Sequence, residues 1–345
     1  MEDKKLNIAV IGCGEISTVH FAVISSCNIV KLVAVCDIIE EKAKAKADIY
    51  GCNYYCDYKE MLKKEDIDVV HICTPHYLHS EMAIFSAELK KHIILEKPVS
   101  INIKDAYELK SVIEKNNVYF TLVFQNRHNN SSIFVKDLLT KNEMGKIKDG
   151  LLILAWNRVG NYYKNSNWKG TWDKEGGGII INQAIHSFDL VNWFVESDYE
   201  YIEANINNRI ITDIEVEDSS EGLIKYKNGV NINYYLINYY SSNRPVMIEL
   251  QCENGIIQHF NDSACVKFND GREQWVYRNN NEVIDYGSGV KDYWGVSHSK
   301  HIIKFYNSII NKSKIDVDIN EAIKTQEIID GIYKSAKEKT KYFKK

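Results

Sequence analysis

The sequence LNIAVIGCGEISTVHFAVI, residues 6–24, decides the fold of the first part of this 345-residue chain. Its apolar run, residues 6–11, leads without a break into GCGEIS (residues 12–17), after which apolar residues recur at helical spacing. In a dinucleotide-binding turn, the first glycine makes the tight turn and the second lets the backbone approach a pyrophosphate. The third position takes a small residue, here Ser17, so that the helix packs on the strand. Taken alone, the pattern also fits a purely structural turn.

The acidic residue at the end of the second apolar run supports the dinucleotide interpretation. The run at residues 30–36 ends at Asp37, which follows Ser17 by 37 − 17 = 20 residues. A carboxylate at this distance accepts hydrogen bonds from the adenosine ribose. Two isoleucines follow Asp37 and no arginine is at hand for a 2′-phosphate, so the sequence favours NAD over NADP. A role of Asp37 at the start of the helix expected from Glu40 is compatible with ribose binding.

The pattern of apolar residues differs between the first and second parts of the chain. Up to residue 124, short apolar runs alternate with helix-like segments, which predicts an α/β domain with a doubly wound parallel sheet. After about residue 145, runs rich in Ile, Val and Tyr are separated by Asn, Gly and Asp turns, with a strong hairpin signal at Asn228-Gly229. We therefore expect an antiparallel or mixed sheet with one covered face. Three helices are expected near residues 180–195, 297–311 and 320–340.

Composition excludes several classes of protein. Lys and Arg number 43 against 47 Asp and Glu, a net charge of −4, so no basic surface indicates nucleic acid or an acidic membrane. No apolar run reaches the ~18 residues of a membrane span, and the first residues lack signal-peptide features. The eight cysteines form no short disulfide framework, which favours reduced thiols and a cytoplasmic location. No cluster of metal ligands is evident in the sequence.

Two of the three prolines mark ligand-binding loops. Pro75 and Pro98 each follow a predicted parallel strand, at the sheet edge where doubly wound folds bind ligands. Thr74-Pro75 and the nearby His79 are expected near the nicotinamide half of the cofactor. His79 also fits a plain position in the first turn of the next helix.

The sequence Glu96-Lys97-Pro98 suggests proton transfer. Desolvation at the end of a buried strand favours the neutral form of a lysine, which suits a proton-transfer role. A structural ion pair with Glu96 is the alternative.

A second constellation lies at residues 168–194. A triple glycine at 176–178 precedes a helical pattern on which Asn182, His186 and Asp189 are spaced four and three apart, so all three are expected on one face. His186 also fits a hydrogen-bonded core histidine, but the polar stripe beside the glycines favours a site.

In this order, the motifs resemble the Gfo/Idh/MocA oxidoreductase family over nearly the whole chain. The resemblance implies an NAD-binding Rossmann domain (1–124) and an α+β substrate domain (125–345) with a large, open, mostly antiparallel sheet. It also implies a homodimer or homotetramer formed through that sheet, an active site between the domains, and Lys97 and His186 as the catalytic pair. The peptide bond before the corresponding proline is often cis in the family.

One departure narrows the resemblance. Many sugar and polyol dehydrogenases of the family have Asp where this chain has Asn182, and the Asn form resembles the branch that oxidises UDP-N-acetylglucosaminuronic acid at its 3-hydroxyl. Further similarity to that branch lies at residues 125–127, 168–172 and 214–218, although Lys169 stands where Arg is expected.

The resemblance implies hydride transfer from a secondary alcohol of a sugar or sugar nucleotide to NAD. His186 is the first choice for the base, Lys97 polarises the oxygen and Asn182 orients the substrate, while the reverse assignment of base stays open. The expected cofactor-binding residues are Gly12, Gly14, Glu15, Ile16, Asp37, Thr74, Pro75, His79, Glu96 and Lys97. The expected substrate-binding residues are Arg127, Lys169, Trp172, Asn182 and Asp189, with Arg158, Tyr162, Tyr163 and Trp168 as further candidates. No metal is expected.

Three other functions fit parts of the sequence. The first is a dehydrogenase of a free sugar, inositol or other cyclic polyol. The second is a non-catalytic dinucleotide-binding sensor, which the presence of both Lys97 and His186 disfavours. The third is reduction of an imine or ketone with NADPH.

Overall fold

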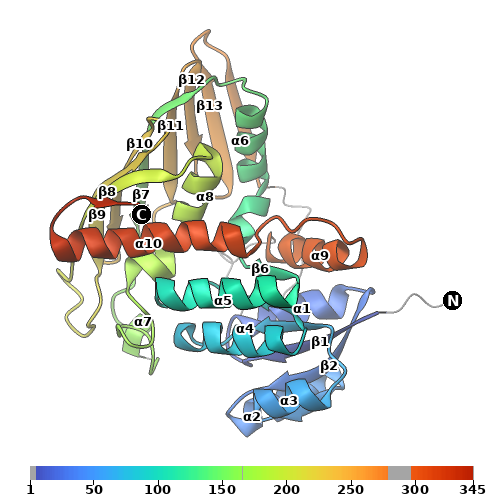
Figure 1. Ribbon diagram of the computed structural model, residues 1–345. Coiled ribbons are helices and arrows are strands. Elements are labelled where there is room, and N and C mark those ends of the chain that lie inside the picture. The colour runs from blue at the N-terminus through green and yellow to red at the C-terminus, as the bar shows by residue number, and fades with distance from the viewer. Residues whose placement is uncertain (1–4, 165, 279–296, 345) are drawn as a thin grey trace. The chain divides into compact units, whose positions relative to one another are not determined.

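The structure is a computed structural model that describes residues 5–164, 166–278 and 297–344 (Figure 1). These residues form two compact units. The first unit contains residues 5–100, 104–125 and 297–323, and the second contains residues 101–103, 126–278 and 324–344.

The first unit is built on a parallel sheet that, within the described residues, has six strands in the order β3-β2-β1-β4-β5-β6. This confirms the predicted doubly wound sheet. The strands are β1 (Leu6–Ile11), β2 (Val30–Cys36), β3 (Asn53–Tyr55), β4 (Val69–Ile72), β5 (His92–Leu95) and β6 (Phe120–Leu122). The helices are α1 (Ser17–Ser26), α2 (Glu40–Tyr50), α3 (Tyr58–Lys64), η1 (His76–Leu78), α4 (His79–Glu88), α5 (Ile103–Asn116) and α9 (Ser297–Ile310), with the short η2 (Gln125–His128) at the end of the unit.

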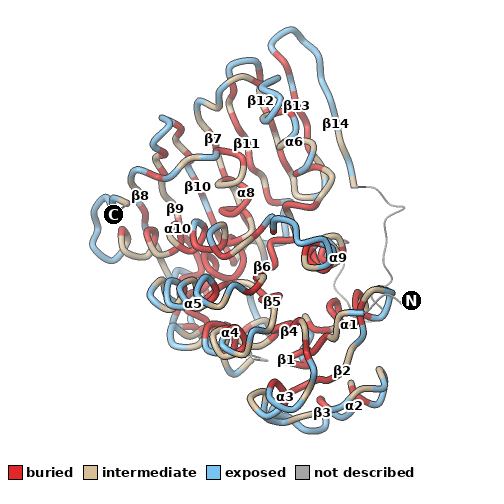
Figure 2. The backbone as a smooth tube through the Cα atoms, turned by 45° about the vertical axis from the view of Figure 1, so that its right-hand side comes forward, coloured by how far each residue is buried: buried red, intermediate tan, exposed pale blue. Residues whose placement is uncertain are grey.

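The sheet is buried because its strands are apolar on both faces. Every residue of β4 is buried, as are the last three residues of β5, and Figure 2 shows these strands inside the unit. Parallel strands place their carboxyl ends at one edge, so the chain leaving β1, β4 and β5 emerges there in neighbouring positions. The three predicted cofactor loops therefore lie along one edge of the sheet.

Helix α9 corrects the predicted domain boundary. We expected residues 125–345 to form the second domain, but residues 297–323 belong to the first unit. The reason is an apolar stripe on α9: Ile302, Phe305 and Tyr306 are buried in the same core as Phe21 of α1. Continuity along the chain was the basis of the prediction, whereas the packing of this stripe decides where the helix lies.

The second unit is built on a sheet that has nine strands in the part of the chain described here, in the order β14-β13-β12-β11-β7-β10-β9-β8-β15. Only β7 and β10 run parallel, so the predicted mostly antiparallel sheet is confirmed. The strands are β7 (Ile147–Ala155), β8 (Tyr199–Asn207), β9 (Ser219–Tyr226), β10 (Asn231–Ile237), β11 (Met247–Cys252), β12 (Gly255–His259), β13 (Ser263–Phe268), β14 (Glu273–Tyr277) and β15 (Tyr342–Phe343). The helical segments are α6 (Asn130–Thr140), α7 (Asn161–Lys164), η3 (Ile179–Ala184), α8 (Ile185–Val195) and α10 (Ile319–Glu338), the last of which begins in the first unit.

Alternating burial along the strands shows that one face of this sheet is covered. In β10 the residues alternate between buried and exposed or partly exposed positions. Helix α6 packs on β12–β14, and η3 packs on β9 and β10. The predicted hairpin at Asn228-Gly229 joins β9 to β10, and Gly229 has φ of 96°, a conformation that glycine adopts without strain.

All eight cysteines are free thiols. No helix within the described ranges is both long enough and apolar enough to cross a bilayer.

The place of α9 in the first unit gives a stability prediction. Ile302→Ala removes a fully buried side chain from the core of that unit and should lower the free energy of unfolding by about 2–5 kcal/mol. Ile310→Ala, on the exposed side of the same helix, should change it by less than about 0.5 kcal/mol. Urea unfolding measures both values. Hydrogen exchange should show the loss of protection in β1 and α1, and loss confined to the second unit would contradict the assignment of α9.

Candidate active site

The glycine turn after β1 leaves its backbone open to a ligand. Gly12 has φ of 94°, and a Cβ there would lie 2.7 Å from the carbonyl oxygen of Cys73, so the turn presses against the chain that leaves β4. A Cβ on Gly14 would meet nothing within 4 Å. The Ser17 hydroxyl donates to the Gly14 carbonyl oxygen at 2.6 Å and ties the turn to the start of α1. A pyrophosphate can therefore approach the backbone at Gly14, as a dinucleotide requires.

Asp37 fastens this turn to the end of β2. One carboxylate oxygen accepts the Cys13 backbone N–H at 2.8 Å, and the other accepts the Ile39 N–H at 2.9 Å, just before α2 begins. A carboxylate oxygen has two lone pairs, and Asp37 is only partly buried, so both oxygens keep capacity for ribose hydroxyls. These residues fit the adenosine half of NAD.

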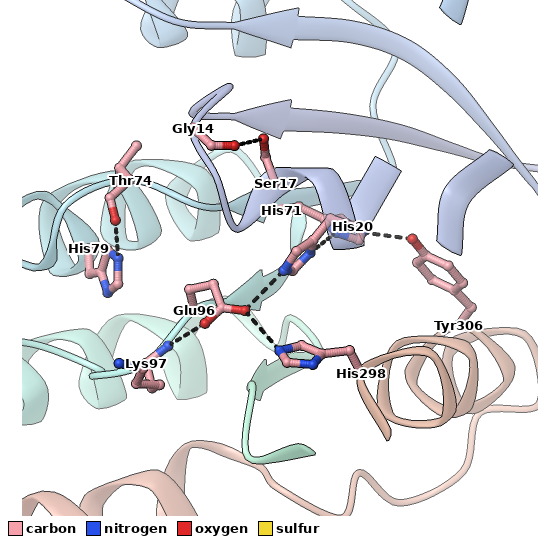
Figure 3. Close-up of polar contacts among 10 residues, drawn as sticks. All are labelled: Gly14, Ser17, His20, His71, Thr74, His79, Glu96, Lys97, His298 and Tyr306. Atoms are coloured by element: carbon pink, nitrogen blue, oxygen red, sulfur yellow. Dashed lines mark hydrogen bonds and ion pairs between the residues drawn. The ribbon is translucent and has the colours of Figure 1, made fainter. Parts of the chain in front are cut away.

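His79 connects the two loops that follow β4 and β5. The ring is fully buried at the start of α4, with Nδ1 2.6 Å from the Pro98 carbonyl oxygen. Its Nε2 lies 2.8 Å from the Thr74 carbonyl oxygen (Figure 3). Burial lowers the pKa of His79. Both ring nitrogens thus face backbone groups of the protein, so His79 acts on the predicted cofactor loops by fixing their separation.

The loop after β5 contains a buried carboxylate next to Lys97. Glu96 Oε1 lies 3.0 Å from His20 Nε2, and Glu96 Oε2 accepts the Lys97 backbone N–H at 3.3 Å (Figure 3). Burial by itself raises the pKa of Glu96, but the hydrogen bond with His20 and the positive charges nearby, Lys97 among them, lower it to about 2. The Lys97–Pro98 peptide bond is cis. The printed contact between the two residues is thus with the Lys97 backbone, and an ion pair of Glu96 with the Lys97 ammonium stays a prediction.

In the second unit, a buried glutamate holds Asn182. The Glu175 side chain is fully buried, and its Oε1 accepts a hydrogen bond from Asn182 Nδ2 at 2.5 Å. Glu175 also accepts the backbone N–H of Gly170. Asn182 Nδ2 further donates to the Tyr162 hydroxyl at 3.2 Å. Because its amide nitrogen serves these two groups, the orientation of the Asn182 amide is fixed.

Burial raises the pKa of Glu175 to about 7, and it raises that of the fully buried Glu217 to about 7 as well. Glu217 accepts N–H groups from Gly178 and Ile180 at 2.9 and 3.1 Å, and the Tyr333 hydroxyl at 2.9 Å.

The triple glycine serves this packing. A Cβ on Gly177 would lie 1.9 Å from the Tyr333 hydroxyl, and a Cβ on Gly178 would lie 2.0 Å from the Glu217 carbonyl oxygen. We expected these glycines to allow close approach of the backbone. The groups that approach are Glu217, just before β9, and Tyr333 of α10, both in the same unit.

Arg127 and Asp189, both predicted to bind substrate, bind each other. Arg127 donates to the two carboxylate oxygens of Asp189 at 2.9 and 2.6 Å, and both side chains are buried. The Thr325 hydroxyl adds a third hydrogen bond to Asp189, at 3.3 Å. A buried bidentate pair of this kind fixes geometry, here that of η2 against α8.

Two cations flank the ring of Tyr162. The Lys169 ammonium lies 4.3 Å from the ring centroid and the Arg158 guanidinium 5.4 Å, while Arg158 also lies over Trp156 at 4.6 Å. Trp172 is 41% exposed, and its indole N–H donates to the Glu215 carbonyl oxygen at 3.0 Å. Positive charge and aromatic surface therefore gather beside Asn182.

The helix that carries His186 begins differently from the prediction. Residues 179–184 form a π-helical turn, and the α-helix starts only at Ile185. The α-helical spacing that placed three polar residues on one face therefore holds from His186 to Asp189 but not for Asn182. Between residues 179 and 191, His186 is the one position that is only partly buried.

Lys97 lies in the first unit and His186 in the second, so their convergence remains part of the proposal below. Across the residues described, no group of three or more His, Cys, Asp or Glu side chains is placed to hold a metal ion.

Two domain models of one protein family match this chain, one in each unit. A model described as an oxidoreductase family with an NAD-binding Rossmann fold matches residues 6–124, and a GFO/IDH/MocA C-terminal domain model matches residues 133–258. The chain belongs to the Gfo/Idh/MocA family of oxidoreductases. Its first unit is an NAD-binding Rossmann domain, as the glycine turn and Asp37 predicted.

Relatives of this oxidoreductase include sugar-converting enzymes. The uncharacterized oxidoreductase YrbE of Bacillus subtilis is 29% identical over 196 residues, 56% of this chain and 55% of that protein. Glucose-6-phosphate 3-dehydrogenase of Bacillus subtilis is 28% identical over 240 residues, 66% of each chain. The chain thus spans about half to two thirds of the length of these curated relatives. The crystal structure of the WlbA dehydrogenase from Chromobacterium violaceum, in complex with NADH and UDP-GlcNAcA, superposes with a TM-score of 0.85 at 25% identity, covering 100% of this chain and 97% of that chain.

Sequence reasoning missed the buried polar groups that support the site of this oxidoreductase. Glu175 directly precedes the triple glycine, and a carboxylate at that position is a signal that could have been read. His20 stands within the apolar helix after the glycine turn. Tyr306 had no sequence signal, because its partners come from segments far away in the chain.

Asp37 gives the prediction for cofactor binding. Asp37→Asn removes the charge that ribose hydroxyls would bind, so the dissociation constant of NAD should rise roughly 10- to 100-fold. Asp48→Asn, the same change at an exposed position of α2, should leave it within about twofold. Displacement of fluorescent NADH by NAD measures both constants. Equal affinity in the two variants would exclude Asp37 from the cofactor site.

Glu175 gives a prediction for pH. The native carboxyls of Glu175 and Glu217 titrate near pH 7, whereas the unfolded chain releases these protons near 4.5. Between these values the native state binds more protons, so stability falls as the pH rises from about 5 to 7 and changes little above. Glu175→Gln should flatten this fall by on the order of 2 kcal/mol. Urea unfolding from pH 5 to 8 measures it, with Glu338→Gln, an exposed position, as control. A fall of equal size in Glu175→Gln and the control would contradict the assignment.

Proposed function

We propose that this oxidoreductase removes a hydride from a secondary hydroxyl carbon of a sugar nucleotide, namely carbon 3 of a UDP-N-acetylhexosaminuronic acid, with NAD as acceptor. The observation that carries the dehydrogenase assignment is the position of Lys97. It follows β5 at the edge of the NAD-binding sheet, with the loop after β4 between it and the glycine turn and with the ionised Glu96 beside it.

Lys97 and His186 divide the work on the hydroxyl. A carboxylate that stays ionised favours the ammonium form of the neighbouring lysine, which suits Lys97 as a hydrogen-bond donor to the substrate oxygen. His186, partly accessible at the start of α8, then takes the hydroxyl proton as general base, a role worth roughly 10²–10⁴-fold in rate. Bound NAD supplies the hydride acceptor, and the protein supplies position and charge.

The second unit supports an anionic, nucleotide-bearing substrate. Lys169 and Arg158 bring two positive charges to the ring of Tyr162, close to Asn182. Such a group can bind a pyrophosphate or carboxylate and stack on a base. Asn182, held by Glu175, presents its amide oxygen for a substrate hydroxyl. The similarity to the WlbA dehydrogenase, whose complex contains UDP-GlcNAcA, supports the same substrate class.

Arg127 and Asp189 take a different role in this proposal. Each residue hydrogen-bonds the other in a buried bidentate pair. We therefore assign the pair to holding α8, and with it His186, in position rather than to direct substrate contact.

Assembly through the second sheet also belongs to the proposal. Aromatic side chains are exposed on β10 and β14, among them Tyr235 and the stacked pair Trp275 and Tyr277. A homodimer or homotetramer would cover such residues, as the family resemblance implies.

A dehydrogenase of a free or phosphorylated sugar, inositol or cyclic polyol is the second candidate. The similarity to glucose-6-phosphate 3-dehydrogenase favours it. It differs from the first candidate in leaving the Lys169 and Arg158 cations without a nucleotide to bind.

Turnover by variants tests the two catalytic assignments. Lys97→Ala and His186→Ala should each lower kcat at least ~100-fold while the dissociation constant of NAD changes little, because each residue acts on the substrate oxygen rather than on the cofactor. Glu88→Ala, at an exposed position of the first unit, is the matched control. Activity close to that of the wild type in either variant would remove that residue from the mechanism.

The substrate class is tested by the formation of NADH, followed by absorbance, with a panel of UDP-sugars, UDP-uronic acids, free and phosphorylated sugars and inositols. Turnover of a UDP-N-acetylhexosaminuronic acid is expected. Turnover of only the free or phosphorylated sugars or the inositols would establish the second candidate instead.

A further inference from the structure

A chain of buried polar side chains runs through the first unit and ends at Glu96 (Figure 3). The Tyr306 hydroxyl lies 2.7 Å from His71 Nε2, and His71 Nδ1 lies 2.8 Å from His20 Nδ1. His20 Nε2 in turn lies 3.0 Å from Glu96 Oε1. The four residues come from α9, β4, α1 and the loop after β5, and the tyrosine and both histidines are fully buried.

The ends of this chain fix its direction. The Glu96 carboxylate accepts the Nε2–H of His20, and a His20 ring with one proton then offers Nδ1 as an acceptor. His71 then donates through Nδ1–H and accepts at Nε2 from the Tyr306 hydroxyl. Burial lowers the pKa of His71 well below its ordinary value, in keeping with a neutral ring.

Donation in the opposite direction, from His20 toward Tyr306, leaves one hydrogen bond unmade. If His20 carried two protons, it would donate to both neighbours and His71 would donate to Tyr306. The Tyr306 hydroxyl hydrogen would then have no acceptor among the described groups around it, in a fully buried position. A buried donor without an acceptor costs about 1–3 kcal/mol, so the direction from Tyr306 to Glu96 is favoured.

A merely structural role explains this chain poorly. Apolar side chains of similar volume fill a core at least as well as a buried polar set, which is stable only when every group is paired. Here every group is paired, and the last acceptor is the carboxylate whose other oxygen binds the Lys97 backbone N–H. Helix α9 adds a second contact, with His298 Nε2 3.8 Å from Glu96 Oε1.

We propose that Tyr306, His71 and His20 are positioning residues that act on Lys97 through Glu96, as a one-directional chain of hydrogen-bond donors that holds the Glu96 carboxylate beside the lysine. Helix α9, packed into the Rossmann unit through its apolar stripe, supplies the first donor of the chain, the Tyr306 hydroxyl. The proposal rests on the assignment of Lys97 to the substrate oxygen in the proposed function.

Two substitutions of His20 distinguish the effect of its Nε2–H donor from the effect of its size. The amide nitrogen of glutamine reaches the position of histidine Nε2, so His20→Gln keeps a donor for Glu96. The shorter asparagine ends near the position of Nδ1, so His20→Asn loses that donor but stays polar. We expect kcat to be at least tenfold lower in His20→Asn than in His20→Gln, with KM for the sugar and the dissociation constant of NAD within twofold of each other. Equal kcat values, or a lower kcat in His20→Gln, would overturn the proposal.

A second readout needs no substrate. The rate at which acetic anhydride acylates Lys97, followed by peptide mass spectrometry of the full chain with NAD bound, reports how firmly the lysine is held as an ammonium. Acylation should be several-fold faster in His20→Asn than in His20→Gln, and equal rates would count against the chain. If the wild type converts no sugar of the panel, the proposed function fails while this comparison still tests the chain.

Thr121→Val is the control for α9 docking. Its hydroxyl bonds to His301 and to the Val317 carbonyl oxygen, both at 3.0 Å, within the same buried region but outside the chain. The rate of Lys97 acylation should be unchanged in Thr121→Val. A rise in this rate equal to that in His20→Asn would show that packing of the region, and not the chain of hydrogen bonds, holds Lys97.

Tyr306→Phe decides the matter if both His20 variants fail to fold, as judged by thermal unfolding. In ¹⁵N spectra of histidine-labelled protein, the wild type should show His20 protonated at Nε2 and His71 at Nδ1. Loss of the hydroxyl should shift the His71 Nε2 resonance and speed acylation of Lys97. Any other pair of tautomers in the wild type, or unchanged acylation in Tyr306→Phe, would refute the proposed direction.

Discussion

The structure of the first unit depends on one constraint: a carboxylate buried beside the loop of Lys97 must stay ionised. Burial alone would favour the protonated form of Glu96, so the fold supplies a ring nitrogen on one oxygen and a backbone N–H on the other. These donors come from separate elements, which must then occupy fixed positions. Helix α9, which packs into the Rossmann domain through its apolar stripe, adds Tyr306 and His298 to this polar set.

The second unit meets the same kind of demand in a different way. Burial of Glu175 and Glu217 disfavours their charged forms, and this cost raises the pKa of both carboxyls. Hydrogen bonds from Asn182, Tyr333 and backbone N–H groups offset part of it. These hydrogen bonds hold the amide of Asn182 in a single orientation. The triple glycine, which has no side chains, packs closely against Glu217 and Tyr333. The Asn182 amide, which we propose faces the substrate, is thus oriented by the buried carboxyl of Glu175.

These two devices give the proposed reaction its division of labour. The Rossmann unit holds the cofactor turn, Asp37 and a lysine with a fixed negative neighbour. The second unit contributes the histidine of α8 together with the cations around Tyr162. Arg127 and Asp189, which have the residue types of substrate ligands, instead anchor α8 through a buried ion pair. Residue type alone did not distinguish an anchor from a ligand, because both roles use a bidentate guanidinium–carboxylate geometry.

The sequence by itself determined the parallel sheet, the glycine turn, Asp37 and the hairpin at Asn228-Gly229, since each depends on neighbours within a short stretch. The tertiary structure alone decided the place of α9, the π-helical turn before His186, and the pairing of Arg127 with Asp189. It alone also decided the chain from Tyr306 to Glu96. Short-range signals record strand alternation and turn geometry, whereas a buried polar contact joins residues up to 235 positions apart and leaves no periodic trace in the sequence.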